Sequence, residues 1–121
     1  MIVTNNDYID LGLPSGTLWA YRDFYRIDNV TSFTDYMAFS FHLTNLIPTT
    51  KQFKELYEFC KIKQYRDFYL CISKINGNKL ILFDGYYETF DKVINIEEIM
   101  SPDRILLYHH NVWCLRLIGR K

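Results

Sequence analysis

Residues 7–20 read DYIDLGLPSGTLWA, and this stretch decides how the chain begins to fold. Apolar side chains occupy every second position from Ile9 to Leu13, the period of a half-buried strand. Pro14 fixes its φ angle and Gly16 tolerates positive φ, so the step between them is typical of a tight turn. Trp19 then supplies a large core side chain. The stretch therefore predicts strand, turn and strand.

The clearest helix is predicted over about residues 49–62. Thr49 and Gln52 have the spacing of a capping box, directly after Pro48. One apolar stripe follows at helical spacing, made of Phe53, Leu56, Tyr57 and Cys60. The opposite face mixes lysine and glutamate, which indicates a solvated surface.

A β-hairpin is predicted from residues 68–75 and 79–83. They flank Asn76 and Gly77, the dipeptide that favours a two-residue type I′ turn. Gly85 marks the end of the second strand.

The other segments give weaker patterns. Residues 21–47 are aromatic but aperiodic, so we expect a long ordered loop with one short strand near 37–41. Residues 91–104 are predicted to be a connector. Residues 105–109 and 112–118 are predicted to form a last hairpin that turns at His110 and Asn111. With 121 residues, the chain is expected to form a single domain over 1–121, of α+β class.

Charge and hydropathy limit the classes of partner that the chain is expected to bind. Fourteen basic and fourteen acidic residues give a formal net charge of zero, which removes the broad attraction that non-specific nucleic-acid binding needs. Local basic patches remain at 51–63 and at Arg116, Arg120 and Lys121. We expect no nucleic-acid partner and no membrane partner, because the apolar runs are too short to span a bilayer. No signal-peptide pattern follows Met1, so we expect folding in a cytoplasm.

The cysteines and histidines lack the spacing of a metal or redox site. Cys60, Cys71 and Cys114 have neither zinc-knuckle nor redox spacing and lie among apolar residues, so we expect buried thiols in a reducing compartment. His109 and His110 are adjacent, so in a strand they would point to opposite faces and not to one metal ion.

Acidic pairs and glycine patterns also lack a catalytic arrangement. The pairs Glu97 with Glu98 and Asp7 with Asp10 are interpreted as solvated surface. The five glycines contain neither a dinucleotide nor a phosphate-loop motif. We therefore expect a protein that is not an enzyme and has no cofactor and no metal.

Aromatic residues are the remaining candidates for binding. Exposed tyrosines provide rigid contact area with a hydrogen-bonding tip. The candidate binding residues are Tyr21, Phe24, Tyr25, Tyr86, Tyr87, His109 and His110.

Three segments together resemble a known family. Tyr8–Gly16 followed by Trp19 and Ala20 resembles the opening of the Fibrobacter succinogenes major paralogous domain, found in gut Bacteroidetes and their bacteriophages. Residues 47–56 are similar to its helix start, and 76–83 to its Asn-Gly-Asn hairpin. The residues that carry the motif structurally are Leu13, Pro14, Gly16, Trp19, Asn76 and Gly77.

The resemblance implies a compact C-type-lectin-like fold, related to the scaffold of formylglycine-generating enzymes without their catalytic cysteines. Family members are often attached to cell-surface or phage fibre proteins as adhesion modules. The family's Tyr-Trp-Ser-Ser stretch is replaced near residues 107–110, and the segment 20–47 is shorter.

These observations lead to a functional hypothesis. We expect a bacteriophage virion structural protein, a capsid-decorating or fibre-associated subunit that binds the major capsid or fibre protein, with homo-oligomers and surface glycans as further partners. Abundant residues with AT-rich codons agree with a phage or bacterial source. The alternatives are a stand-alone lectin-like carbohydrate-binding protein and a phage-encoded inhibitor of a host enzyme.

Overall fold

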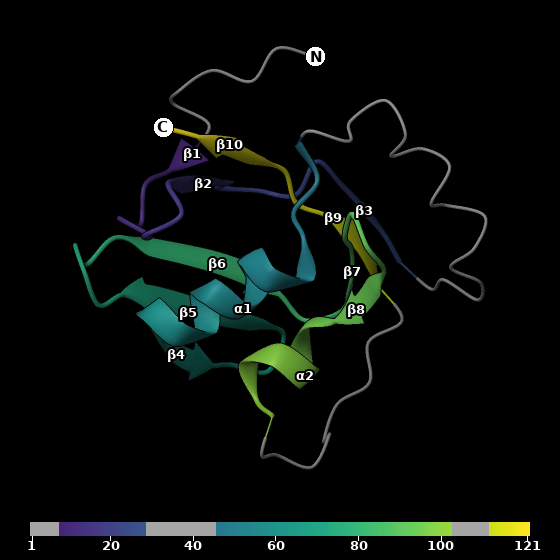
Figure 1. The fold of residues 1–121 in the computed structure, drawn as a ribbon. Helices are drawn as coiled ribbons and strands as arrows, with labels where there is room; N and C mark the ends of the chain where they lie inside the picture. Colours follow the sequence, from purple (N-terminus) through teal and green to yellow (C-terminus); the bar gives the residue numbers. More distant parts are fainter. Residues whose placement is uncertain (1–7, 29–45, 103–111) are drawn as a thin grey trace.

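The computed structural model describes residues 8–28, 46–102 and 112–121. This part of the chain holds ten strands in three sheets and two helices (Figure 1), so the α+β class is confirmed. The predicted strand at 37–41 and the first strand of the last hairpin, 105–109, lie outside the described residues.

The three sheets are small and mostly antiparallel. The first has the order β1 (Tyr8–Ile9), β2 (Thr17–Ala20), β10 (Ile118–Arg120). The second has the order β3 (Tyr25–Ile27), β9 (Trp113–Leu115), β7 (Tyr86–Glu88), β8 (Val93–Asn95), with β7 and β9 parallel. The third has the order β4 (Cys60–Gln64), β5 (Phe68–Ser73), β6 (Lys79–Phe83). The helices are α1 (Thr50–Phe59) and α2 (Ile96–Met100).

The opening stretch folds as strand, turn and strand. The Gly16 N–H donates to the Leu13 carbonyl at 2.9 Å, and Gly16 has a φ of 77°, so the turn is confirmed. The first strand is shorter than predicted and ends at Ile9. Gly12 has a φ of 67°, a left-handed conformation that no strand accommodates. Leu11 and Leu13 are nevertheless buried.

Helix α1 begins where the sequence predicts and ends three residues early. The capping box of Thr49 and Gln52 is present. Cys60 is already extended, with φ −122° and ψ 147°, because it opens a five-residue pairing of β4 with β5. Cys60 is buried as expected, but from a strand. Tyr57 was expected in the core and is 43% exposed.

The central hairpin is confirmed, but its first strand ends at Ser73, two residues earlier than predicted, and its turn differs. Ser73 and Asn78 close a four-residue loop, because the Ser73 N–H donates to the Asn78 carbonyl at 2.8 Å. The predicted two-residue turn is therefore wrong. The Ser73 hydroxyl accepts the N–H groups of Ile75 and Asn76, which stabilises the longer loop.

The C-terminal half differs most from the sequence interpretation. Residues 91–104 were expected to be a connector, but they contain β8 and α2, the latter capped by the Asn95 side chain. The single strand expected at 112–118 is split into β9 and β10, which belong to different sheets. The first and last strands of the described chain, β1 and β10, both pair with β2 (Figure 1).

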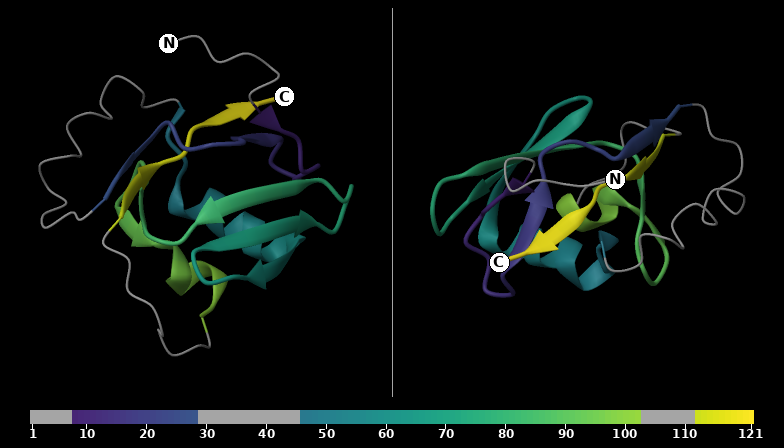
Figure 2. Two further views of the ribbon diagram at one scale, coloured as in Figure 1. Left: turned by 180° about the vertical axis from the view of Figure 1, so that it is seen from behind. Right: turned by 90° about the horizontal axis from the view of Figure 1, so that it is seen from above.

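An aromatic group lies at the centre of the core. The Phe53 ring lies 4.9 Å from the Trp19 ring and 5.4 Å from the Tyr87 ring, centroid to centroid. Each of the three side chains is fully buried. Helix α1 covers one face of the β4–β5–β6 sheet, and the views from behind and above leave the other face uncovered by the described elements (Figure 2).

Candidate functional site

The motif residues of the N-terminal stretch and of the hairpin contact one another. The side-chain amides of Asn76 and Asn78 both donate to the Asp10 carbonyl, at 2.9 and 2.7 Å. The Ser73 hydroxyl donates to the Leu11 carbonyl at 2.6 Å. A Cβ atom on Gly12 would lie 3.0 Å from Ile75 Cγ2, so only glycine fits without displacing that side chain. We call this contact of residues 10–12 with 73–78 the motif junction.

Helix α1 is attached to the same stretch. Glu55 accepts both the backbone N–H and the hydroxyl of Ser15, at 3.1 and 2.7 Å. The Gln52 side-chain amide donates to the Thr17 hydroxyl at 3.3 Å. The residues of the three family-like segments therefore hold one another in place, which is a structural role.

The cysteines are buried and not bonded to one another, as predicted. Burial raises the pKa of Cys60 to about 11 and that of Cys71 to about 12, and it also raises the pKa of Cys114. All three are therefore protonated thiols at neutral pH, and the thiolate is the nucleophilic form.

The predicted aromatic binding residues fall into two groups. Tyr21 and Phe24 are exposed, at 43% and 40%. Tyr25 and Tyr86 are half-buried, whereas Tyr87 is fully buried and its hydroxyl donates to the Phe83 carbonyl at 2.8 Å. Tyr87 is therefore a core residue and not a surface contact.

Tyr25 has a buried polar role. Its hydroxyl donates to Glu88 Oε1 at 2.7 Å, and the Trp113 indole N–H donates to the same oxygen at 3.0 Å. Burial, together with the Glu88 carboxylate, raises the pKa of Tyr25. This cluster joins β3, β7 and β9 in one sheet.

Two charged residues expected at the surface are buried. Arg116, part of a predicted basic patch, is 1% exposed and pairs with Asp23 at 2.8 Å. It also donates to the Ala20 carbonyl. Glu97 is 3% exposed, so interpreting it as solvated surface was wrong: α2 places it against the core. Lys121 pairs with Asp10 at 2.8 Å, which leaves Arg120 as the exposed arginine of this tail.

His109 and His110 lie outside the described residues. Within 8–28, 46–102 and 112–121, no three His, Cys, Asp or Glu side chains gather where they could hold a metal ion. None of the helices in these ranges has both the length and the apolar character needed to cross a bilayer.

The sheet face opposite α1 is a further candidate binding surface. The register pairs Phe68 with Phe83 and Leu70 with Ile81, so these side chains share one face. Ile81 and Phe83 are 43% and 36% exposed, while Phe68, Leu70 and Ile72 are half-buried. Together with Lys61, Lys63 and Lys79 of the same face, these five apolar residues form what we call the outer sheet face.

Aromatic rings extend this face at one end. Tyr65 stacks on Phe68, with centroids 4.7 Å apart and planes 15° apart, and is itself 46% exposed. The Arg26 guanidinium lies 4.9 Å from the Phe83 ring centre. Such flat, rigid side chains lose little conformational freedom when a partner covers them.

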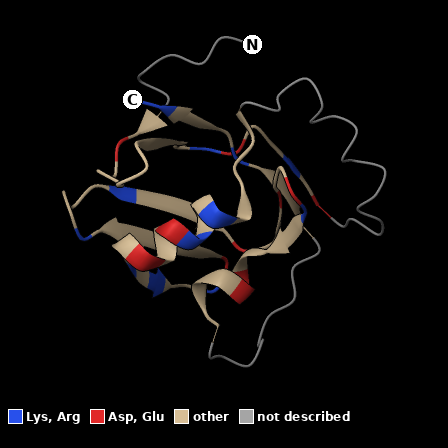
Figure 3. Cartoon of the chain, viewed as in Figure 1, with Lys and Arg blue, Asp and Glu red and all other residues tan. Residues whose placement is uncertain are grey.

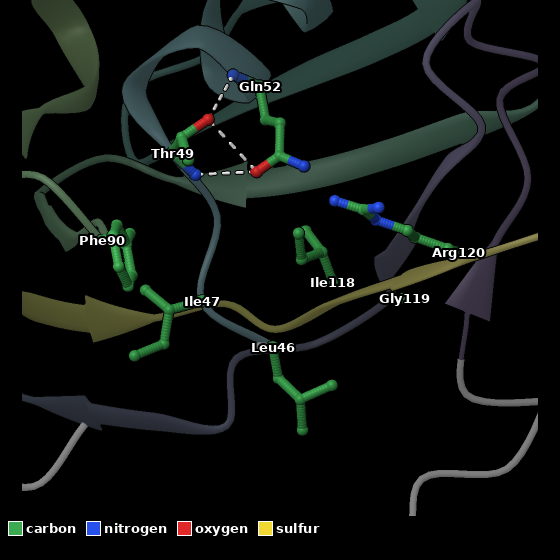
Figure 4. A pocket seen from close by; sticks show the side chains of 8 residues that line it. All are labelled: Leu46, Ile47, Thr49, Gln52, Phe90, Ile118, Gly119 and Arg120. Carbon is green, nitrogen blue, oxygen red and sulfur yellow. Dashed lines mark hydrogen bonds between the residues drawn. The ribbon is translucent and has the colours of Figure 1, made fainter. Parts of the chain in front are cut away.

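A groove opens elsewhere on the surface, between the start of α1 and β10. Its volume is about 450 Å³. Figure 4 places Phe90 on one side and Arg120 on the other, with Ile47 and Ile118 between them and the capping pair of α1 above. Phe90 is 63% exposed.

Comparisons of the chain with protein-family models, with curated proteins and with solved structures found no match.

Sequence reasoning missed the outer sheet face. Residues 68–73 and 79–83 read FYLCIS and KLILF, apolar on both faces, which is the pattern of a strand buried on both sides. The available signal was Lys61, Lys63 and Lys79, each on the strand face opposite to the buried one. No sequence pattern predicts that Phe90 and Arg120 line one groove, because only the folded chain brings these distant residues to the same part of the surface.

Proposed function

We propose that this protein is a non-catalytic module that binds another protein through its outer sheet face. The observation that carries this proposal is five apolar side chains on the sheet face opposite α1, where Ile81 stays 43% exposed although the Arg26 guanidinium lies against the Phe83 ring. Monomeric proteins rarely leave contiguous apolar patches of this kind exposed unless a partner covers them.

The charges around the face indicate the chemistry of the partner. Strands β4, β5 and β6 carry three lysines and no acidic residue. By contrast, the outer surface of α1 mixes both signs (Figure 3). A partner surface with an apolar centre and an acidic border would complement the outer sheet face, and charge complementarity of this kind increases association rate and specificity.

The partner we propose is a protein of a bacteriophage particle, either the capsid or a fibre, with this chain as a decorating or fibre-associated subunit on a C-type-lectin-like scaffold. The support is the resemblance of three segments to a domain family found in phages. These segments also contact one another, at the motif junction and through the hydrogen bond of Ser15 to Glu55. The buried thiols support a role without covalent catalysis.

Quantitative mass spectrometry tests this function. The tagged chain is recovered from its native phage or organism, and co-purifying proteins are counted per copy. Stoichiometric recovery of one capsid or fibre protein supports the proposal. Recovery of the chain alone, of an enzyme, or of a second copy only would overturn it.

A stand-alone carbohydrate-binding role is the second candidate. The observation that favours it is the exposed ring of Phe90 beside a groove that is separate from the outer sheet face.

A further inference from the structure

The groove beside Phe90 combines three kinds of contact. Phe90 offers an exposed aromatic ring on one side. Arg120 offers an exposed cation on the other, and no ion pair to it is formed within the described residues. β10, which carries Arg120, is an edge strand of its sheet, and edge strands present unpaired backbone donors and acceptors.

The polar groups near the start of α1 are mostly occupied. The backbone N–H and the hydroxyl of Thr50 donate to Asp91, at 3.0 and 2.7 Å, so this carboxylate already occupies one side of the helix start. The Gln52 amide has two hydrogens, and within the described residues it uses one toward Thr17, which leaves the other as a donor at the groove. Arg120 is the one charged residue that lines this groove.

A ligand that complements these contacts has one negative charge, a flat apolar face and several hydroxyl groups. A neutral sugar lacks the charge for Arg120, and a simple carboxylate lacks the ring for Phe90. A sugar whose ring carries a carboxylate satisfies both, and its hydroxyls suit the free Gln52 donor and the backbone of β10. A volume of about 450 Å³ lies within the range of small-molecule sites.

We propose, as a refinement that rests on the carbohydrate-binding candidate above, that the groove between Phe90 and Arg120 binds an acidic sugar, with the ring stacked on Phe90 and the carboxylate paired with Arg120. The site is separate from the proposed docking at the outer sheet face, because no residue of that face lines the groove. One protein could therefore bind a protein partner and an acidic saccharide at the same time.

An NMR titration of the full chain tests the site. The probes are glucuronate and glucose, which differ only in the carboxylate, and acetate, which has the carboxylate without the ring. We expect saturable shifts of the Gln52, Ile118 and Gly119 amides with glucuronate, in the millimolar range typical of a single sugar, about 1–10 mM. Glucose and acetate should bind at least about tenfold more weakly.

Matched variants locate the contacts. Arg120→Gln should weaken glucuronate binding about tenfold or more, and Phe90→Ala several-fold, whereas the neighbouring Lys121→Gln should leave it unchanged. Equal shifts with acetate would show unspecific carboxylate attraction and overturn the proposal. Undiminished binding by Arg120→Gln, or no shifts with glucuronate, would also overturn it. Failure of this sugar titration is distinguishable from failure of the virion-protein recovery experiment, because the variants used here change no residue of the outer sheet face.

Discussion

The motif junction and the outer sheet face lie on the same hairpin and differ in almost every physical respect. At the junction, polar groups are paired: the Asp10 carbonyl accepts two side-chain amides, and the Ser73 hydroxyl makes three hydrogen bonds. On the outer sheet face, Ile81 and Phe83 expose apolar surface to solvent. The polar groups named at the junction are paired within the chain, whereas the face leaves apolar side chains exposed.

This difference distinguishes the junction residues, which stabilise the fold, from the outer-face residues, which are exposed and available for binding. A family-like motif suggests a functional signature, yet Asn76 and Asn78 hold the hairpin against Asp10. By contrast, Ile81 and Phe83, which expose apolar surface to solvent, belong to no recognisable motif. Substitutions at the junction should therefore lower stability, and substitutions on the face should lower binding.

The largest loss of stability is expected for Gly12→Ala. A left-handed φ of 67° costs a non-glycine residue about 1–2 kcal/mol. The new Cβ atom would also lie 3.0 Å from Ile75 Cγ2, which adds about 1 kcal/mol of overpacking. Urea unfolding measures the sum.

Gly16→Ala is the matched control, because Gly16 has a φ of 77° and open space where its Cβ would lie. It should show the backbone cost alone. Equal losses for the two variants would mean that the close contact at the junction contributes nothing.

Ser73→Ala is expected to lower the free energy of unfolding by about 1–3 kcal/mol, because the buried Leu11 carbonyl loses its donor. Ser101→Ala, which removes one contact to Gln64 at 3.2 Å, should cost less than half as much. Thermal unfolding followed by circular dichroism distinguishes the two. A loss at Ser73 no greater than at Ser101 would contradict the structural role of the junction.

A smaller effect is expected at the start of α1, from Asp91. Hydrogen bonds from Thr50 hold the pKa of Asp91 below its usual value, against the opposing effect of burial. A lowered folded-state pKa means that the stabilisation is present above the unfolded pKa of about 3.9 and is lost as the pH falls through the folded value. Asp91→Asn should therefore cost about 0.3–1 kcal/mol near neutral pH, less at high salt because Asp91 is exposed.

Melting temperatures of both proteins across the acidic range check this prediction. The difference between Asp91→Asn and the unchanged chain should shrink toward zero in acid. Asp28 is an exposed residue that pairs with Arg26, so Asp28→Asn provides the control for loss of a surface carboxylate. A difference that stays constant down to acid pH would contradict the charge contribution of Asp91.

Local signals predicted the parts of the fold that short-range chemistry determines. The capping box of Thr49 and Gln52 and the turn at Leu13–Gly16 depend on residues a few positions apart, and both were predicted correctly. The end of α1 was missed because pairing of β4 with β5 overrides the helical pattern at Cys60. The split of 112–118 was missed because Arg116 turns inward to Asp23, a partner 93 positions away.

The candidate surfaces were less predictable for the same reason. Tyr87 and Tyr21 are alike in sequence, yet one is fully buried and the other is 43% exposed. Leu80 and Ile81 are adjacent apolar residues on opposite faces of β6, and only the packing of α1 decides which is the core side. Exposure of this kind depends on contacts between distant segments, which composition and periodicity do not record.

The smallest effect on stability, and the largest on binding, is expected on the outer sheet face. Ile81→Glu should change the free energy of unfolding by less than about 0.5 kcal/mol, because Ile81 is substantially solvated already. Tyr57→Glu is a matched control: Tyr57 is also 43% exposed and the substitution adds the same charge, but it lies on α1.

The most direct measurement is therefore the amount of capsid or fibre protein recovered per folded molecule by these two variants and the unchanged chain. We predict that Ile81→Glu reduces recovery at least about tenfold while Tyr57→Glu leaves it unchanged. Equal recovery by both variants would contradict the outer sheet face as the binding surface.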